Sequence, residues 1–401
     1  MTRVIAAAAA LVLLAGCGGA SGGGGSTVAG EPGASAAPSH TGHGSSAPVP
    51  PAAPLRAGER FQTLTMARPY TPQPPTTGST DDYRCFLVDP KFATTTFLTG
   101  SQFLPQNADV VHHAIFFRVP AAQVAEARSL DEASPGDGWT CFGGTGIGGP
   151  RAQTQQLRNA PWVAAWAPGG TESLASPGTG TLMEPGSQLV MQVHYNLLAT
   201  GGEATSTDQS ALRIRLAPGN SKLEPLLTNL MVAPVELPCP PGETGKLCDR
   251  DLAVFDVMRR FGDDSGFTVA GLHLLCNEGK PVPPGNTQHC DRKIREPMVV
   301  RAAAGHMHLL GRSIKIELNP GTPKAQVLLD VPAYNFDDQG ARRLAKPVAA
   351  KPGDVMRVTC THDATLRSKL PELQSLKPRY VVWGEGTSDE MCLGVVVWTR
   401  K

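Results

Sequence analysis

The chain has 401 residues, with 36 Lys and Arg against 35 Asp and Glu, which gives a formal net charge of +1. This length exceeds what one small core needs and suits two domains of about 150 residues each. The balanced charge provides no basic surface for nucleic acid, so a nucleic-acid partner is not expected.

The first residues predict an exported protein with a lipid anchor. Arg3 precedes an apolar run, residues 4–14, that is too short to span a bilayer as a stable helix and is typical of an export signal. The run closes on Leu-Ala-Gly-Cys, which resembles a bacterial lipobox, so residues 1–16 are expected to be removed and Cys17 to carry the lipid. Such an anchor would hold the protein to the cell membrane or the outer membrane. The alternative is a plain secretory signal that leaves Cys17 unmodified.

Residues 17–55 are predicted to form a flexible linker. They consist largely of Gly, Ser, Ala and Pro, with too few large apolar residues to build a core. Nine cysteines minus Cys17 leave eight, an even number, and disulfides are the default state in an exported chain.

Beyond the linker, short strand-like runs separated by Pro and Gly predict an all-β fold. Examples are VVHHAIFFRV, QLVMQVHYNLL, ALRIRLAP, SIKIEL, DVMRVTCT and GVVVWTR. Runs of this length favour antiparallel, jelly-roll-like sandwiches over βαβ units. Helices are expected only over residues 121–133 and 251–261, in connections between strands. A polar stretch with Pro and Gly, residues 216–225, marks the joint between an N-terminal sandwich, residues 56–222, and a C-terminal one, residues 223–401.

The distribution of the ten histidines is the first sign of a metal. Five of them lie in three strand-like settings, and these are His112, His113, His194, His306 and His308. The other five lie in linker-like or loop-like contexts, and these are His40, His43, His273, His289 and His362.

His306 and His308 are two residues apart, so in a strand both would project from one face while Met307 points to the other. Two imidazoles at this spacing make half of a copper or zinc site. Ala302 and Ala304 on the same face would leave room beside a metal for oxygen or substrate. Taken alone, the pattern is also explained by a strand that happens to carry two histidines.

Adjacent His112 and His113 would face opposite sides of a regular strand. Binding of one ion by both needs a bulge or a strand end, with one ring using Nδ1 and the other Nε2. One buried and one exposed histidine is the simpler outcome. His194 by itself is equally explained as a hydrogen-bonded strand histidine.

Taken together, four ordered segments resemble one enzyme family. They are VHHAIFF at 111–117, LVMQVHYNLL at 189–198, GHMHLLGR at 305–312 and GEGTSDEMCLGVVVW at 384–398. With WVAAWAPGG and PGDVMRVTCTHDA, they resemble the type II copper, ascorbate-dependent monooxygenases, the family of peptidylglycine alpha-hydroxylating monooxygenase and dopamine beta-monooxygenase. The resemblance covers both catalytic domains, roughly residues 80 to 398.

The resemblance implies two copper ions, held apart across a solvent-accessible cleft with one on each sandwich. The electron-transfer copper has three histidine ligands, which correspond here to His112, His113 and His194. The oxygen-binding copper, where the substrate C–H bond is attacked, has two histidines and a methionine, which correspond to His306, His308 and Met391. Imidazoles serve both copper oxidation states, and a thioether favours Cu(I).

The implied reaction inserts one oxygen atom of O2 into a C–H bond while the other becomes water. Two electrons are needed, from ascorbate or another one-electron reductant. The chain is expected to act as a monomer on a small molecule. The alternative is a copper-binding lipoprotein that keeps the fold and ligands without turnover.

The family also has a disulfide beside its methionine ligand, which corresponds to Cys360–Cys392. If the joint near residue 222 is right, Cys85 and Cys141 are the only cysteines of the first domain and pair by elimination. The remaining four have three possible pairings that the sequence does not separate, and these are Cys239, Cys248, Cys276 and Cys290.

The substrate positions depart from the family. The peptide-amidating enzyme holds its substrate carboxylate with Arg, Asn and Tyr at positions that correspond here to Ala304, Leu393 and Val395. A carboxylate would meet an apolar wall, so a less polar or differently anchored substrate is expected. Gln192, two residues before His194 on the same strand face, is a candidate for the pocket or for orienting a ligand, although solvent exposure would explain it equally well.

Overall fold

The computed structural model describes residues 50–75, 79–134, 136–149, 160–204 and 206–401. This part of the chain falls within one compact unit. The predicted export signal, Cys17 and most of the predicted linker lie outside the described residues. Within them, no helix is long and apolar enough to cross a membrane.

The last residues of the predicted linker already contact the folded body. Gln102 donates a hydrogen bond to the carbonyl of Pro50 at 2.7 Å. The guanidinium of Arg215 donates to the carbonyls of Ala53 and Pro54 at 2.7 and 2.9 Å. Residues 50–54 are therefore held against the first sheet.

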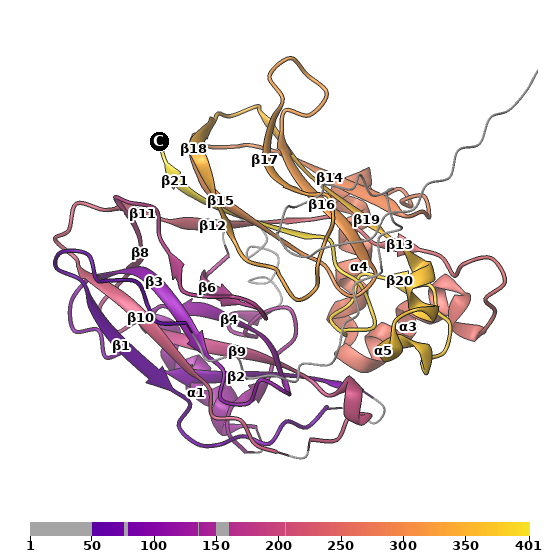
Figure 1. Cartoon of the computed structure of the whole chain (residues 1–401), viewed down its shortest axis with the longest axis horizontal. Helices are drawn as coiled ribbons and strands as arrows, with labels where there is room; N and C mark the ends of the chain where they lie inside the picture. The colour runs from indigo at the N-terminus through magenta and orange to yellow at the C-terminus, as the bar shows by residue number, and fades with distance from the viewer. Residues whose placement is uncertain (1–49, 76–78, 135, 150–159, 205) are drawn as a thin grey trace, which may run out of the picture. The chain divides into compact units, whose positions relative to one another are not determined.

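The first half of the described chain builds two sheets (Figure 1). One has the strand order β1 (Arg60–Thr65), β10 (Ala211–Pro218), β3 (Thr96–Leu104), β8 (Thr179–Met183) and β11 (Glu224–Pro225), with β7 (Ser173–Leu174) also on β3. The other has the order β5 (Trp139–Thr140), β2 (Asp81–Val88), β9 (Gln188–Asn196), β4 (Val111–Val119) and β6 (Trp162–Trp166). All pairings are antiparallel except that of β11 with β8.

The second half builds two four-stranded sheets and a short pair. The first sheet has the order β12 (Leu227–Val232), β21 (Leu393–Arg400), β15 (Met298–His306) and β18 (Arg342–Ala350). The second has the order β14 (Thr287–Lys293), β19 (Val355–His362), β16 (Gly311–Leu318) and β17 (Gln326–Val331). The pair is β13 (Glu236–Leu237) with β20 (Val381–Val382).

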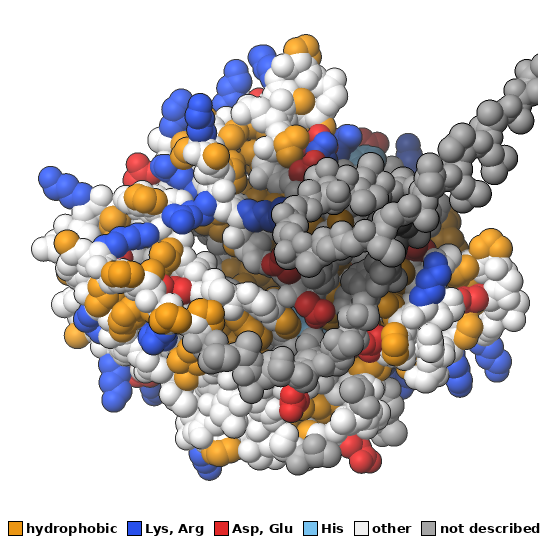
Figure 2. Space-filling model, viewed as in Figure 1, with side chains coloured by type: hydrophobic (Ala, Val, Ile, Leu, Met, Phe, Trp, Pro, Cys, Tyr) orange, Lys and Arg blue, Asp and Glu red, His pale blue; other side chains and the backbone are white. Residues whose placement is uncertain are grey.

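The predicted all-β class is confirmed, because most described elements are strands in antiparallel sheets, consistent with sandwiches. β11 belongs to a sheet of the first half, and β12, the next strand along the chain, belongs to a sheet of the second half. The boundaries of the two domains stay a prediction. On the face shown in Figure 2, Lys and Arg side chains are interspersed with neutral and acidic ones, as the near-zero net charge leads one to expect.

Helices lie in connections between strands, and one of them is unexpected. The predicted segment 121–133 contains the 3-10 turn η1 (Ala121–Gln123) and α1 (Val124–Glu132), and segment 251–261 matches α3 (Arg250–Phe261). The sequence did not predict α4 (Asp263–Asn277), which follows α3 almost directly. The part of the chain that the structure describes also has four short helical turns, and they are η2 (Leu198–Thr200), η3 (Lys246–Cys248), η4 (Ala364–Ser368) and α5 (Pro371–Gln374).

Four disulfides link the described cysteines. Two are the pairs expected from the sequence, Cys85–Cys141 and Cys360–Cys392. The structure selects one of the three pairings left open for the others, Cys239–Cys248 and Cys276–Cys290.

Two glycines allow the second pair of large sheets to approach closely. Gly305 on β15 pairs with Gly394 on β21. A Cβ atom at Gly305 would lie 2.5 Å from Cγ2 of Ile314, and one at Gly394 would lie 2.7 Å from Cδ1 of Ile316. Since side chains alternate along a strand, the residues next to these glycines must face away from the partner sheet.

We expect Gly305→Ala to lower the free energy of unfolding by about 1–3 kcal/mol, because the added methyl overpacks the contact with Ile314. The matched control is Gly285→Ala, where a Cβ meets nothing within 4 Å and the change should stay within about 0.5 kcal/mol. Urea unfolding of both variants measures the difference. Equal stabilities would contradict the close approach.

Candidate metal centre

The first histidine group joins two neighbouring strands. His112 and His113 lie on β4 and His194 on β9, and all three side chains are buried. The pairing register between these strands shifts between Val111 and His113. This irregularity lets two adjacent side chains turn toward one point, as shared binding of an ion requires.

The three rings converge through one kind of atom. The Nδ1 atoms of His112, His113 and His194 are separated by 3.1, 3.2 and 3.2 Å, and they form a group that could hold a metal ion. Imidazole nitrogens this close together could all bind one metal ion, because metal–nitrogen bonds are about 2.0 Å long. The expected mixture of Nδ1 and Nε2 is therefore wrong, because all three rings present Nδ1.

Asp81 sets the proton position of His194. Its Oδ1 accepts a hydrogen bond from His194 Nε2 at 2.9 Å, so the Nδ1 lone pair of that ring points toward the other histidines. Burial lowers the pKa of His194, despite Asp81, and burial with the neighbouring imidazoles holds the pKa of His113 well below its ordinary value. Neutral rings with converging lone pairs are the form that binds a cation.

Aromatic rings fix the planes of these histidines. Tyr83 stacks on His194, with ring centroids 4.0 Å apart and an interplanar angle of 11°. Phe336, from the second half of the chain, stacks on His112 at 4.4 Å. The Tyr83 hydroxyl also donates a hydrogen bond to the carbonyl of Glu385 at 2.7 Å.

The second histidine group lies where β15 ends. His306 is the last residue of the strand, and His308 lies beyond its end. The prediction that both histidines project from one face of a regular strand is therefore wrong for His308. The two rings are nevertheless neighbours, with centroids 5.2 Å apart. Met307 between them is buried in the hydrophobic core.

Both rings of this group leave Nε2 available. His306 Nδ1 is 2.5 Å from Gln339 Oε1, and His308 Nδ1 is 3.2 Å from the carbonyl of Asp389, so each Nδ1 carries the donated proton. His308 Nε2 is buried and has no hydrogen-bond partner among the described residues. A buried imidazole lone pair without a partner is costly unless it binds something, and a metal ion fits this donor.

Glu390 supports this group and was missed by the sequence analysis. Its carboxylate accepts hydrogen bonds from the backbone amides of His308, Leu310 and Met391 at 3.0, 2.6 and 3.3 Å, and it lies 3.3 Å from His362 Nε2. Burial raises the pKa of Glu390, but the interactions with His362 and His308 together outweigh it and lower the pKa overall. The two adjacent acids of "SDEMC" were the available signal.

Three histidines assigned to linker-like or loop-like contexts lie in regular structure instead. One of them, His289, is exposed on β14, and the other two are paired with acids or carbonyls. His362 ends β19 and is buried, with Nε2 3.3 Å from the carbonyl of Met391. His273 lies on α4 and pairs with the buried Glu236 at 2.7 Å. Their partners are distant in sequence, which is why the local context misled the prediction.

His306 and Met391 share one cavity of about 1230 Å³. Ala304, Leu393 and Val395, the three positions expected to form an apolar wall, also line it. The disulfide Cys360–Cys392 directly follows Met391 and ties that end of β21 to β19.

The two histidine groups adjoin each other. The rings of His113 and His306 have centroids 5.5 Å apart, so the expected separation across a solvent-accessible cleft is not what the structure has. The reason is a tie between the halves, because Asp81 Oδ1 also accepts hydrogen bonds from the amide and hydroxyl of Thr387 at 3.2 and 2.6 Å. This tie draws the segment before Met391 onto β2.

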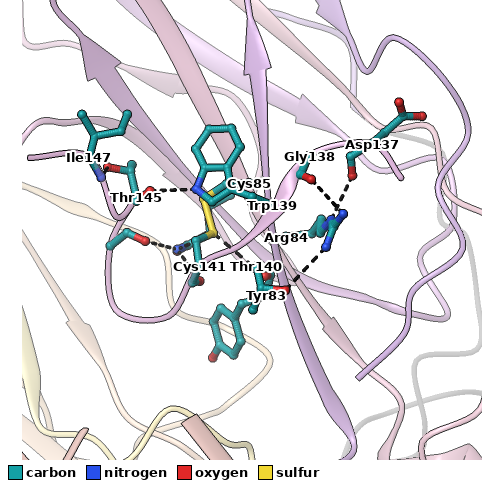
Figure 3. Close-up of a disulfide and its surroundings, with 12 residues drawn as sticks. Tyr83, Arg84, Cys85, Asp137, Gly138, Trp139, Thr140, Cys141, Thr145 and Ile147 are labelled. Carbon is teal, nitrogen blue, oxygen red and sulfur yellow. Dashed lines mark hydrogen bonds between the residues drawn. A yellow bond between two sulfur atoms is a disulfide. The ribbon is translucent and has the colours of Figure 1, made fainter. Parts of the chain in front are cut away.

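Gln192 is buried rather than solvent exposed and lines the same cavity. Its Nε2 donates to the carbonyls of Cys141 and Gly144 at 3.2 and 3.3 Å. Figure 3 shows the loop beyond Cys141 held by the disulfide with Cys85 and by the indole of Trp139, which donates to the carbonyl of Thr145 at 2.8 Å. Gln192 therefore fixes this cavity wall.

Glu385 provides a carboxyl group to the cavity. Burial, together with the charge of Asp389, raises its pKa to about 7. The group sits beside Gly143, whose Cβ would lie 3.1 Å from Glu385 Oε1.

Removal of the Asp81 carboxylate should weaken copper binding by the first histidine group. We expect Asp81→Asn to lower copper affinity by about 10- to 100-fold, because His194 loses the partner that orients its ring. The matched control is Asp82→Asn, a neighbouring buried carboxylate that binds the Tyr70 hydroxyl and the Gln73 amide instead. Competition with a chromogenic copper chelator measures both affinities, and equal losses would contradict the role of Asp81.

Protein prepared without copper should lose stability as the pH falls below about 6.5. Burial lowers the pKa of His306 to about 3 from an ordinary value of 6.5, so at intermediate pH the unfolded chain binds a proton that the folded chain does not. Each such residue should then lower the free energy of unfolding by about 1.4 kcal/mol per pH unit between those limits.

Guanidinium unfolding at pH 7.5, 6.0 and 5.0 measures this slope. His306→Gln should flatten it, while His289→Gln, which changes an exposed histidine on β14, should leave it unchanged. A slope that is the same in all three proteins would refute the expectation.

Two solved structures that match this chain are both distant. Allantoicase is 10% identical over 86% of this chain and 90% of its own, with a TM-score of 0.18. A Paenibacillus xanthan lyase is 11% identical over 88% of this chain and 27% of its own, with a TM-score of 0.19. Such TM-scores support no conclusion about fold or function. Comparison with curated proteins gives no match.

A family model does match the second half of the chain. Residues 272–400 match the family described as copper type II ascorbate-dependent monooxygenase, C-terminal domain. The matched segment contains His306, His308 and Met391, whereas the first histidine group lies outside it. By this match, residues 272–400 belong to the C-terminal-domain family of the copper type II ascorbate-dependent monooxygenases.

Proposed function

We propose that this chain is a copper-dependent monooxygenase that hydroxylates a C–H bond of a small molecule with O2. The observation that carries the proposal is the cavity shared by His306 and Met391, with the Nδ1 triangle of the first group beside it. The overall balance is R–H, O2, two electrons and two protons giving R–OH and water. Ascorbate or another one-electron donor supplies the electrons.

Six side chains would hold two copper ions, which together supply the two electrons that reduce O2. The first set is His112, His113 and His194, and the second is His306, His308 and Met391. A soft thioether beside imidazoles suits Cu(I), the oxidation state that reacts with oxygen.

The surrounding residues keep these ligands in the binding form. Asp81 holds the proton of His194 on Nε2, Gln339 holds that of His306 on Nδ1, and the carbonyl of Asp389 holds that of His308 on Nδ1. Ligand rings fixed in one tautomer need little rearrangement when an ion binds.

The cavity wall selects the substrate. Ala304, Leu393 and Val395 present only apolar surface beside His306 and Met391. A carboxylate placed there would lose its hydration without gaining a partner. Productive binding of glycine-extended peptides would overturn this part of the proposal.

A second candidate function is copper binding without turnover. It is favoured by the 5.5 Å separation between the rings of His113 and His306, which differs from the expected cleft between two copper sites. Copper content and oxygen consumption distinguish the two functions.

We further propose that the protein is exported, acts as a monomer and is held at a membrane by lipid on Cys17. Four disulfides among the described residues support an oxidising compartment outside the cytoplasm. Mass spectrometry of the mature N-terminus would test the lipid.

Copper-loaded protein should bind two ions and consume O2 with a reductant only when a suitable substrate is present. We expect Met391→Leu to reduce this uptake at least tenfold, because leucine keeps the volume but lacks the sulfur ligand. The matched control is Met356→Leu, a buried methionine on β19 that does not line the cavity, and it should retain activity.

Two bound coppers without turnover on any substrate would favour the binding protein. Zinc retained against excess copper would contradict both functions.

A further inference from the structure

In the sheet formed by β12, β21, β15 and β18, the first three strands carry apolar side chains on both faces next to His306, whereas the edge strand β18 begins with Arg342 and Arg343. Its inner face packs on the partner sheet, where Gly305 and Gly394 approach Ile314 and Ile316. Ala303 and Val396, on the same inner face, are paired across the strands and fully buried.

The outer face of this sheet forms successive apolar rows that lead away from His306. The row beside His306 consists of Leu393 and Val232, and the next consists of Ala304, Val395 and Leu230. The third row consists of Ala302, Val397 and Thr228, with Arg343 of β18 paired to Ala302 at its end. Every member of these rows lines the cavity. His306 lies four residue positions beyond Ala302 along the strand, and at about 3.3 Å per position the rows extend over about 13 Å.

This pattern is unusual for a sheet face that is not buried against another sheet. Antiparallel strands with one open face ordinarily place polar residues on it. Here the two rows nearest His306 are apolar on β12, β21 and β15, and polar side chains, Thr228 and Arg343, enter only at the third row. The face borders a cavity of about 1230 Å³, which exceeds the usual range of about 300–1,000 Å³ for small-molecule pockets. Apolar rows of this length beside His306 indicate an occupant with an apolar part that lies along them.

Helix α4 extends the apolar surface toward solvent. Phe267 and Leu274, two helical turns apart on one side of α4, are 72% and 68% exposed. Both line the same cavity. Exposed large apolar side chains at a cavity mouth are explained if a ligand passes or rests against them.

We propose that the substrate is an elongated hydrocarbon chain, about ten carbon atoms or longer, that lies along these rows between α4 and His306. This assignment rests on the proposed function for the reaction, but the binding of the chain stands on the rows alone. The small side chains of Ala302 and Ala304 leave the width that the chain occupies.

Displacement of a fluorescent fatty-acid probe, 11-(dansylamino)undecanoic acid, by 1-alkanols of six to fourteen carbons tests the proposal on the full-length protein without reductant. Each added methylene should tighten binding about fourfold until the rows are filled. Binding that does not depend on chain length would overturn it.

Three variants locate the binding site. Ala304→Trp should weaken binding of the longest alkanols at least tenfold by filling the second row, and Val395→Thr should weaken it severalfold by adding a hydroxyl at nearly constant volume. Val327→Trp is the control, since Val327 is 53% exposed on β17 and does not line the cavity. Thermal unfolding of each variant establishes that it folds. If Ala304→Trp does not fold, Val395→Thr still tests the proposal.

Turnover assays with the same alkanols separate this proposal from the proposed function. Chain-length-dependent binding that is weakened severalfold in Val395→Thr, without oxidation of any alkanol, would support the hydrocarbon site and count against the monooxygenase. Oxidation of short polar substrates with no preference for chain length would support the monooxygenase and overturn the hydrocarbon site.

Discussion

One carboxylate, that of Asp81, connects the two halves of the candidate centre. Its Oδ1 accepts hydrogen bonds from His194 on one side and from the amide and hydroxyl of Thr387 on the other. Burial raises the pKa of Asp81, but these donors outweigh burial and lower the pKa overall, so the group is an anion inside the protein. A buried anion is tolerated only with such partners. The orientation of one histidine and the position of the segment before Met391 therefore depend on each other.

A second buried carboxylate, that of Glu390, holds the other histidine group in place. Its oxygens bind the backbone at His308 and Met391, which places one proposed ligand relative to the other across a gap of more than eighty residues in sequence. Each histidine group is therefore backed by one buried anion. Because the rings of His113 and His306 nearly touch, these anions offset the repulsion that cations bound on neighbouring groups would exert on each other.

Local sequence patterns predicted the strands, because alternation is a property of short segments. The assignment of His194 to one group with His112 and His113 came from the family resemblance, since no local spacing joins them. Local patterns did not predict what depends on tertiary contact. His362 looked like a loop residue, yet it is buried against Glu390, its neighbour only in the folded chain. Helix α4 lacked a one-sided apolar pattern, since Phe267 and Leu274 border a cavity rather than a core. The contact between the groups follows from Asp81 and Thr387, which are 306 residues apart.

The pairing register of β15 sets which way both the proposed ligand His306 and the apolar cavity wall face. A shift of one residue would exchange the two faces of the strand. It would then turn the side chains of Ala304 and His306 toward the partner sheet, where Ile314 leaves room only for a glycine. The close approach of the two sheets at Gly305 and Gly394 thus forces His306 outward, and it forces Ala304, Leu393 and Val395 outward with it. Any change of side chain on the outer face alters the cavity without disturbing this contact, so the same backbone can hold the metal ligands while its wall accepts different substrates.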